Sequence, residues 1–93
     1  MKKVTVMRSL RDKYGVSARE LADAAGVSQQ YISDLELGRY RERYDYRKSG
    51  EPLVQKAFET VAAARKEQAW QLSEDLANNR HRLLGFVEEN NEL

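Results

Sequence analysis

The sequence contains no cysteine, a single proline and a single histidine among its 93 residues. Without cysteine, disulfide bonds and cysteine-ligated metal sites are excluded. No apolar run approaches the roughly 20 residues that a membrane-spanning helix needs, so none is expected. The first ten residues hold two lysines but no continuous apolar stretch, which does not fit a signal peptide. We therefore expect a cytoplasmic protein with no membrane contact.

Signatures of catalysis are also missing. His81 stands between Arg80 and Arg82 without a serine or cysteine motif to pair with, and we interpret it as a solvated helix residue. Neighbouring acids such as Glu74 and Asp75 point to different sides of a helix, so they do not form a working carboxylate pair. The sequence contains no glycine-rich phosphate loop and no metal-ligand spacing. We expect no enzyme, no metal and no cofactor.

The net charge of +1 is small, but the charge is distributed unevenly along the chain. Residues 1–50 carry 11 Lys and Arg against 7 Asp and Glu, whereas residues 51–93 carry 5 against 8. A basic part beside an acidic part is typical of a protein that faces nucleic acid on one side and solvent or a partner on the other.

Residues 17–38 predict two short helices separated by Gly26. Ser17 with Glu20 makes a capping box for the first helix, and Ser28 can cap the second. Gly26 can adopt the left-handed conformation that ends the first helix. Apolar residues three and four apart give the pair a buried face, made of Leu21, Ala25, Val27, Ile32 and Leu35. This spacing predicts a helix-turn-helix.

Through these features, residues 10–39 resemble the lambda repressor and Cro family of bacterial and phage regulators, also called the xenobiotic-response-element family. The resemblance implies an all-α, lambda-repressor-like helix-turn-helix domain over residues 1–64, and residues 65–93 extend past this domain as a long C-terminal helical arm. It also implies that the second helix of the motif reads base edges in the major groove of DNA. By position, the base-reading residues are Gln29, Gln30, Ser33 and Asp34.

The resemblance carries one further implication, and the chain shows one departure from the family pattern and one unusual residue. Arg11 and Glu36 match a structural ion pair that ties the first helix of the family to the end of the recognition helix. Many members carry glutamine where this chain has Ala18, and that glutamine braces a base-reading one. An acid such as Asp34 would be repelled by phosphates unless it accepts from a cytosine amino group or points away.

Contacts with the DNA backbone are expected from helix starts and from a basic insertion, residues 39–50. In the functional interpretation this insertion is a flap beside the recognition helix that ends at a Ser-Gly and Glu-Pro break. In the alternative, it is a solvated connection whose tyrosines pack on the domain and whose arginines pair with Glu42 and Asp45. The expected phosphate-contacting residues are Ser17, Ser28, Tyr31, Arg39, Arg41, Arg43, Arg47 and Lys48.

A first helix is expected around Met7, Leu10 and Tyr14, and a long one from about residue 53 to 78 with Pro52 in its first turn. The apolar spacing of the long helix has one slip, at Arg65. A second helix over about 79–89, or a continuous rod, would follow. We expect this arm to form a homodimer interface through Trp70, Leu72, Leu76, Leu83, Leu84, Phe86 and Val87. Alternatively, the arm folds back and fills the core of a monomer.

The sequence therefore predicts a sequence-specific regulator of transcription, a repressor that binds an inverted-repeat operator in double-stranded DNA as a dimer. Two symmetric copies would read half-sites roughly 34 Å apart, one turn of DNA. One alternative is an antitoxin whose C-terminal helices bind a toxin. Another is an accessory DNA-binding factor of a mobile element.

Overall fold

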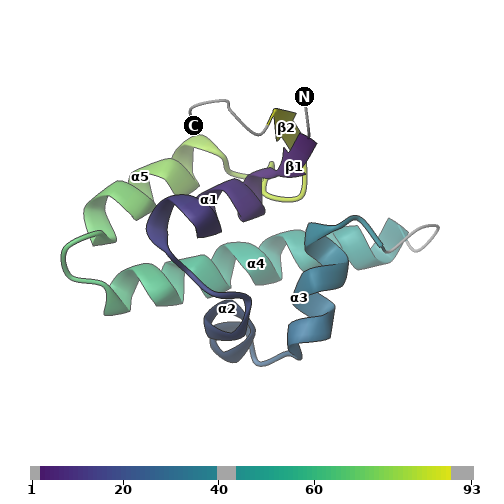
Figure 1. Ribbon diagram of the computed structural model, residues 1–93, viewed down its shortest axis with the longest axis horizontal. Helices are drawn as coiled ribbons and strands as arrows, with labels where there is room; N and C mark the ends of the chain where they lie inside the picture. Colours follow the sequence, from purple (N-terminus) through teal and green to yellow (C-terminus); the bar gives the residue numbers. More distant parts are fainter. Residues whose placement is uncertain (1–2, 40–43, 89–93) are drawn as a thin grey trace.

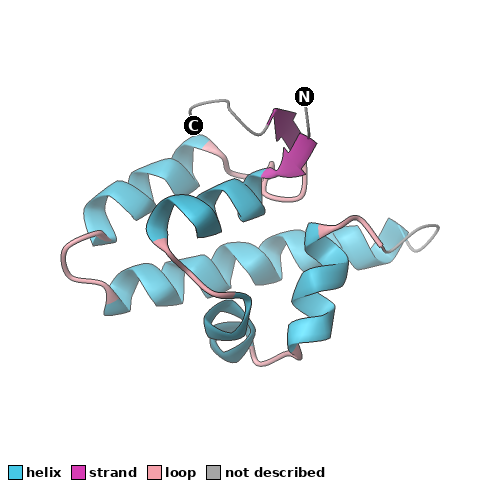
Figure 2. Cartoon of the chain, in the orientation of Figure 1, coloured by secondary structure: helices cyan, strands magenta, loops and turns pink. Residues whose placement is uncertain are grey.

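The computed structural model describes residues 3–39 and 44–88, except the side chains of residues 44–48. Five helices make up most of these residues and surround one hydrophobic core (Figure 1). The elements in chain order are β1 (Lys3–Thr5), α1 (Val6–Tyr14), α2 (Ala18–Ala25), α3 (Gln29–Glu36), α4 (Tyr44–Ala64), α5 (Ala69–Asn78) and β2 (Phe86–Glu88). The predicted helical class is confirmed, and the structure adds a small two-stranded sheet (Figure 2).

Local side-chain caps define the helix-turn-helix as the sequence predicts. The Ser17 hydroxyl accepts from the Glu20 amide at 3.0 Å at the start of α2, and the Ser28 hydroxyl accepts from the Tyr31 amide at 3.1 Å at the start of α3. Gly26 ends α2 with φ at +72°, a conformation that costs a side-chain-bearing residue energy. These caps satisfy backbone groups that the helices leave open, so the turn between α2 and α3 is set locally.

Helix α4 is the longest element, and α2 and α5 pack against it from opposite sides, with α3 beside α2 and α1 beside α5 (Figure 1). It begins at Tyr44, so the expected start at Pro52 is wrong and part of the predicted flap is helical. The expected continuation to residue 78 is also wrong, because the helix ends at Ala64. Arg65, where the apolar pattern slips, donates to the carbonyl oxygens of Tyr14 and Gly15 at the end of α1. This contact holds the turn that reverses the chain into α5.

Residues 79–85 form turns and residues 86–88 form a strand, so the helix expected over 79–89 is wrong. The Glu51 carboxylate on α4 accepts from the Leu83 amide at 3.0 Å and the Leu84 amide at 2.9 Å. Strand β2 then pairs antiparallel with β1, placing Val4 opposite Val87. Partners from α4 and from the chain start therefore replace the helical hydrogen bonds that this segment forgoes.

The C-terminal segment folds back onto α1 and α4. Four residues expected at a dimer interface are instead buried in the core of the single chain: Leu72, Leu76, Leu83 and Leu84. They pack with core residues of α1 and α4 such as Leu10 and Phe58. Of the other three, Trp70 is 76% exposed, Phe86 is 51% exposed and Val87 is partly buried. Of the seven expected interface residues, these three remain available to a partner chain.

Candidate nucleic-acid interface

The outer face of α3 gathers the residues predicted to read bases. Ile32 and Leu35 point inward and are fully buried, which fixes the rotation of the helix about its axis. The side chains left on the outer side are exposed or half-buried: Gln29, Gln30, Ser33 and Asp34. Two of them contact each other, because the Gln30 amide nitrogen Nε2 donates to Asp34 Oδ1 at 2.9 Å. The face is therefore polar and partly organised before any ligand arrives.

The starts of α2 and α3 present exposed hydroxyls beside free backbone amides. Ser17 and Ser28 each use an oxygen lone pair to cap their helix, which leaves the hydroxyl proton available to donate to an acceptor such as a phosphate. Helix N-termini also attract anions through their unpaired N–H groups. Their predicted role at the DNA backbone stays a prediction.

Other predicted phosphate-contacting residues are described to different extents. Arg39 is exposed directly after α3, and its amide donates to the Asp34 carbonyl oxygen at 2.8 Å. Tyr31 is half-buried on α3. Arg41 and Arg43 lie outside the described residues, and Arg47 and Lys48 fall on the first turns of α4 with their side chains outside the description.

One basic residue was missed by the sequence analysis. Arg19 is exposed in the first turn of α2, two residues after the capping Ser17, and makes no ion pair with any described residue. Its place next to a helix start that was already assigned to the DNA backbone could have drawn attention to it. A guanidinium here suits phosphate because it offers several donors and keeps its charge.

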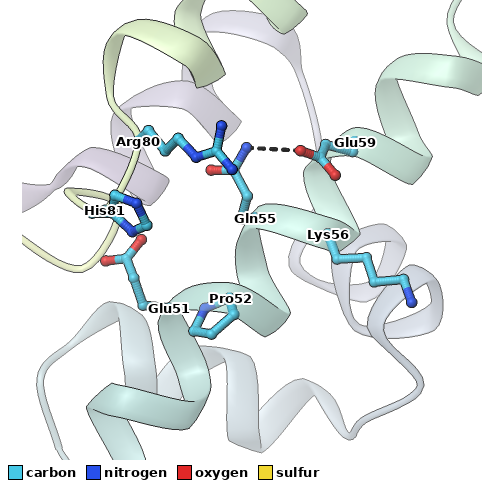
Figure 3. A pocket seen from close by; sticks show the side chains of 7 residues that line it. All are labelled: Glu51, Pro52, Gln55, Lys56, Glu59, Arg80 and His81. Atoms are coloured by element: carbon cyan, nitrogen blue, oxygen red, sulfur yellow. Dashed lines mark hydrogen bonds between the residues drawn. The ribbon is translucent and has the colours of Figure 1, made fainter.

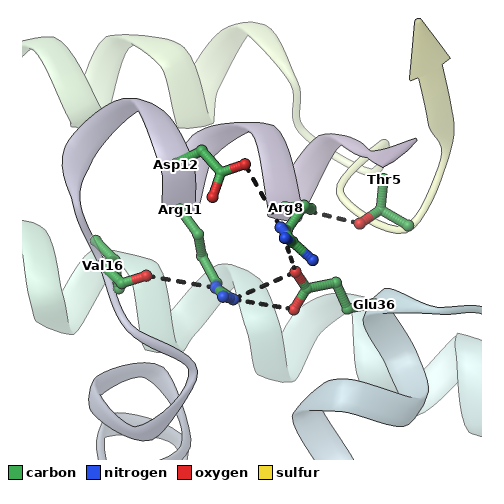
Figure 4. Close-up of polar contacts among 6 residues, drawn as sticks. All are labelled: Thr5, Arg8, Arg11, Asp12, Val16 and Glu36. Atoms are coloured by element: carbon green, nitrogen blue, oxygen red, sulfur yellow. Dashed lines mark hydrogen bonds and ion pairs between the residues drawn. The ribbon is translucent and has the colours of Figure 1, made fainter. Parts of the chain in front are cut away.

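An ion network at the C-terminal end of α3 joins the recognition helix to α1 (Figure 4). Arg11 Nη1 lies 3.3 Å from both carboxylate oxygens of Glu36, and Arg8 Nε lies 3.4 Å from one of them. Arg11 also donates from Nε to the Val16 carbonyl, and Arg8 bridges onward to Asp12 at 3.4 Å. The predicted contact between Arg11 and Glu36 is therefore present, with Arg8 as a second cation.

The same network perturbs the titration of Glu36. Its side chain is nearly fully buried, and the loss of hydration raises the pKa of Glu36 above its usual value near 4.5. The arginines oppose this shift, but their distances exceed the 2.7–2.9 Å typical of strong charge-assisted bonds. One Arg11 nitrogen serves both oxygens, so the paired two-nitrogen geometry that binds carboxylate best is absent here. Burial therefore outweighs attraction.

A shallow hollow of about 310 Å³ lies between α4 and the turn after α5 (Figure 3). Its lining residues are Glu51, Pro52, Gln55, Lys56, Glu59, Arg80 and His81. The Glu51 carboxylate is occupied by the Leu83 and Leu84 amides, and Gln55 Nε2 donates to Glu59 at 3.0 Å. Among the described residues the buried Gln55 Oε1 has no hydrogen-bond partner. Glu51 thus fastens the C-terminal turn to α4, whereas the bond between Gln55 and Glu59 lies within the helix.

Comparison with family models matches residues 7–42 to helix-turn-helix, which covers less than half of the chain. The match spans α1 to α3, so the resemblance to the lambda repressor and Cro type is confirmed over these residues. Searches of curated proteins and of solved structures found no match. No described helix is long and apolar enough to cross a membrane. Residues 7–42 thus form a DNA-binding module of the kind that regulates transcription.

Proposed function

We propose that this protein, whose residues 7–42 are a helix-turn-helix of the lambda repressor and Cro type, is a sequence-specific repressor that binds double-stranded DNA. The observation that carries the proposal is the exposed pair Gln29 and Gln30 at the start of α3, on a helix whose opposite face is locked into the core. The first residues of such a helix enter the major groove, and a glutamine amide can pair with both edge atoms of adenine. Binding to DNA would place the protein at the nucleoid.

We divide the interface into groups that read bases and groups that hold phosphates. Gln29, Gln30 and Ser33 are assigned to bases, whereas Ser17 and Ser28 are assigned to the backbone with the exposed Arg19 and Arg39. Phosphate contacts fix the register of the protein but carry no sequence information directly. Each neutralised phosphate steepens the salt dependence of binding, with a log-log slope of about −0.9 per phosphate.

We also propose that the protein binds an inverted repeat as a dimer, and we assign the contact to the C-terminal strand. The half-exposed Phe86 lies against the turn that follows α3, with a ring atom 3.3 Å from where a Gly38 side chain would begin. Leu37, next to that glycine, is also 50% exposed. Burying these neighbouring apolar side chains against a second copy would link the two recognition helices near their ends.

DNA binding can be tested by selecting genomic fragments with the purified protein, sequencing them and mapping protected bases by footprinting. On the selected sites, Gln29→Ala and Gln30→Ala should relax base preference by about 1–3 kcal/mol per lost bidentate contact. Arg39→Ala should instead weaken all sequences alike, because it removes a backbone contact. Lys66→Ala is the matched control, since Lys66 is an exposed cation on the turn between α4 and α5. Absence of any protected site would refute the proposal.

The dimer can be tested by analytical ultracentrifugation of the free protein and its DNA complex. Phe86→Ser should shift the protein to monomer and lower its affinity for the full operator, while each half-site binds as before. Trp70→Ser is the control, because Trp70 is more exposed but lies in the first turn of α5. If Trp70→Ser rather than Phe86→Ser gives monomers, the interface is assigned to the wrong surface.

A further inference from the structure

Two side chains on the outer face of α3 form one hydrogen-bonded unit. Gln30 Nε2 donates to Asp34 Oδ1 at 2.9 Å, and the residues are one helical turn apart. Both belong to the surface that the proposed function turns toward bases. The acid that looked unfavourable near phosphates thus has a partner on its own helix.

The contact determines which way the Gln30 amide points. A carboxylate only accepts hydrogen bonds, so it favours the amide orientation that presents the nitrogen and disfavours the flipped one that presents the oxygen. It also uses one of the two N–H groups of the amide. The Gln30 amide can therefore offer a ligand one N–H donor and its carbonyl oxygen, and the contact with Asp34 keeps these two groups from exchanging positions.

We propose that Asp34 is a positioning residue that makes Gln30 select adenine over guanine at one base pair of the operator. This inference rests on the proposed function. In the major groove adenine offers the N7 acceptor and the N6 donor, which match the remaining N–H and carbonyl of Gln30. Guanine offers two acceptors, N7 and O6. The fixed carbonyl would face O6 and be repelled, and no second N–H is free to donate.

Removing Asp34 changes this balance in a defined way. The Gln30 amide could then rotate and donate both N–H groups to the two guanine acceptors. Asp34→Ala should therefore lose discrimination between the purines at that one base pair and keep it elsewhere. A residue that only stabilised the helix would change the affinity for all sequences together.

The test uses the full-length protein and the operator found by genomic selection, with the base pair read by Gln30 located through Gln30→Ala. At that position the adenine–thymine pair is replaced by guanine–cytosine and, separately, by hypoxanthine paired with 5-methylcytosine. The second replacement turns the purine N6 donor into an O6 acceptor while it keeps the methyl group in the groove. Equilibrium competition gives the affinity ratio for the wild type, Asp34→Ala, Gln30→Ala and the double variant. Asp23→Ala is the control, because it removes an exposed acid from α2.

The wild type and Asp23→Ala should prefer adenine by about 5- to 150-fold, the range of one bidentate contact. Asp34→Ala should bring this ratio close to one, and the double variant should equal Gln30→Ala. Two results would overturn the inference. In the first, Asp34→Ala keeps the preference for adenine. In the second, adding Asp34→Ala to the Gln30→Ala variant also weakens the base preference at a different base pair. The second result would mean that Asp34 itself accepts from a cytosine. If the wild type protects no site, the proposed function fails instead.

Discussion

The helix starts of the N-terminal region and the C-terminal region are held by polar contacts of different range. In α1 to α3, the helix starts are set by hydroxyls that accept from amides three residues away, at Thr5, Ser17 and Ser28. From residue 65 onward several contacts reach far along the chain. Arg65 donates to Tyr14 at the end of α1, and Asp75 on α5 accepts from Lys13 at 2.8 Å and from Tyr14.

This difference indicates how the two regions depend on each other. The local caps of α2 and α3 need nothing from the C-terminal residues, whereas α5 and β2 take their positions from groups on α1, β1 and α4. Yet the four buried leucines supplied by the C-terminal region complete the core beneath the helix-turn-helix. The C-terminal region therefore depends on the motif for its position, and the motif depends on that region for its stability.

The largest expected effect is the loss of stability when a C-terminal leucine is truncated, and it tests whether that leucine packs within the chain or between two copies. Leu84 is 1% exposed in the single chain, so Leu84→Ala should lower the free energy of unfolding by about 2–5 kcal/mol. Urea denaturation at two protein concentrations should give the same loss, because the side chain packs within its own chain. A loss that grows as the protein is diluted would instead place Leu84 at an interface between copies.

The next effect concerns the ion network between α1 and α3. Arg11→Ala should cost about 2–4 kcal/mol, less than the full cost of stranding a buried charge because Arg8 also contacts Glu36. Glu36→Gln should cost less, because it removes the buried carboxylate and the new amide oxygen can still accept from Arg11, which also keeps its bond to the Val16 carbonyl. Comparison of the two variants in urea denaturation at pH 7 tests this order. Equal losses would mean that the carboxylate is not stranded when Arg11 is removed.

Glu36 also makes the stability of the protein depend on pH in the acid range. Because burial raises the pKa of Glu36, its contribution to stability is present below the usual value near 4.5 and is lost as pH rises through the higher folded value. Glu36→Gln should remove that slope in the pH range above 4.5, which a series of urea titrations at different pH values can measure.

The stability contributed by the contact between α1 and α5 should decrease as the pH rises in the alkaline range. The hydrogen bond to Asp75 raises the pKa of Lys13 above 10.5, and burial with a hydrogen bond to Asp75 raises the pKa of Tyr14 above 10.0. Both groups stabilise the fold below their unfolded values, and this is lost as pH rises through the folded ones. Asp75→Asn should cost about 1–2 kcal/mol at pH 7. Its difference from the wild type should shrink above pH 10, which thermal melts can follow; a constant difference would contradict the assignment.

The same contrast in range explains what the sequence could predict. The turn could be predicted from Ser17, Gly26 and Ser28, because caps act over about three residues. The base-reading role proposed for Gln29 and Gln30 could be predicted because they directly follow the cap of α3. The break after Ala64 needs the carbonyls of Tyr14 and Gly15, about fifty residues earlier. Strand β2 needs the chain start as its partner, and three residues show no usable alternation. The contact between Gln30 and Asp34 has a local spacing of four residues and was within reach of the sequence.

The smallest expected effect tests whether a local cap also serves DNA. Ser28→Ala should lower the free energy of unfolding by about 1 kcal/mol through loss of the cap on α3. Ser28→Asp should keep the stability, because aspartate caps a helix about as well as serine, but it puts a negative charge where a phosphate is expected. Urea denaturation and equilibrium binding to operator and scrambled duplexes should therefore separate the two variants. If Ser28→Asp binds both duplexes as tightly as the wild type, the hydroxyl of Ser28 is a cap and no phosphate lies beside it.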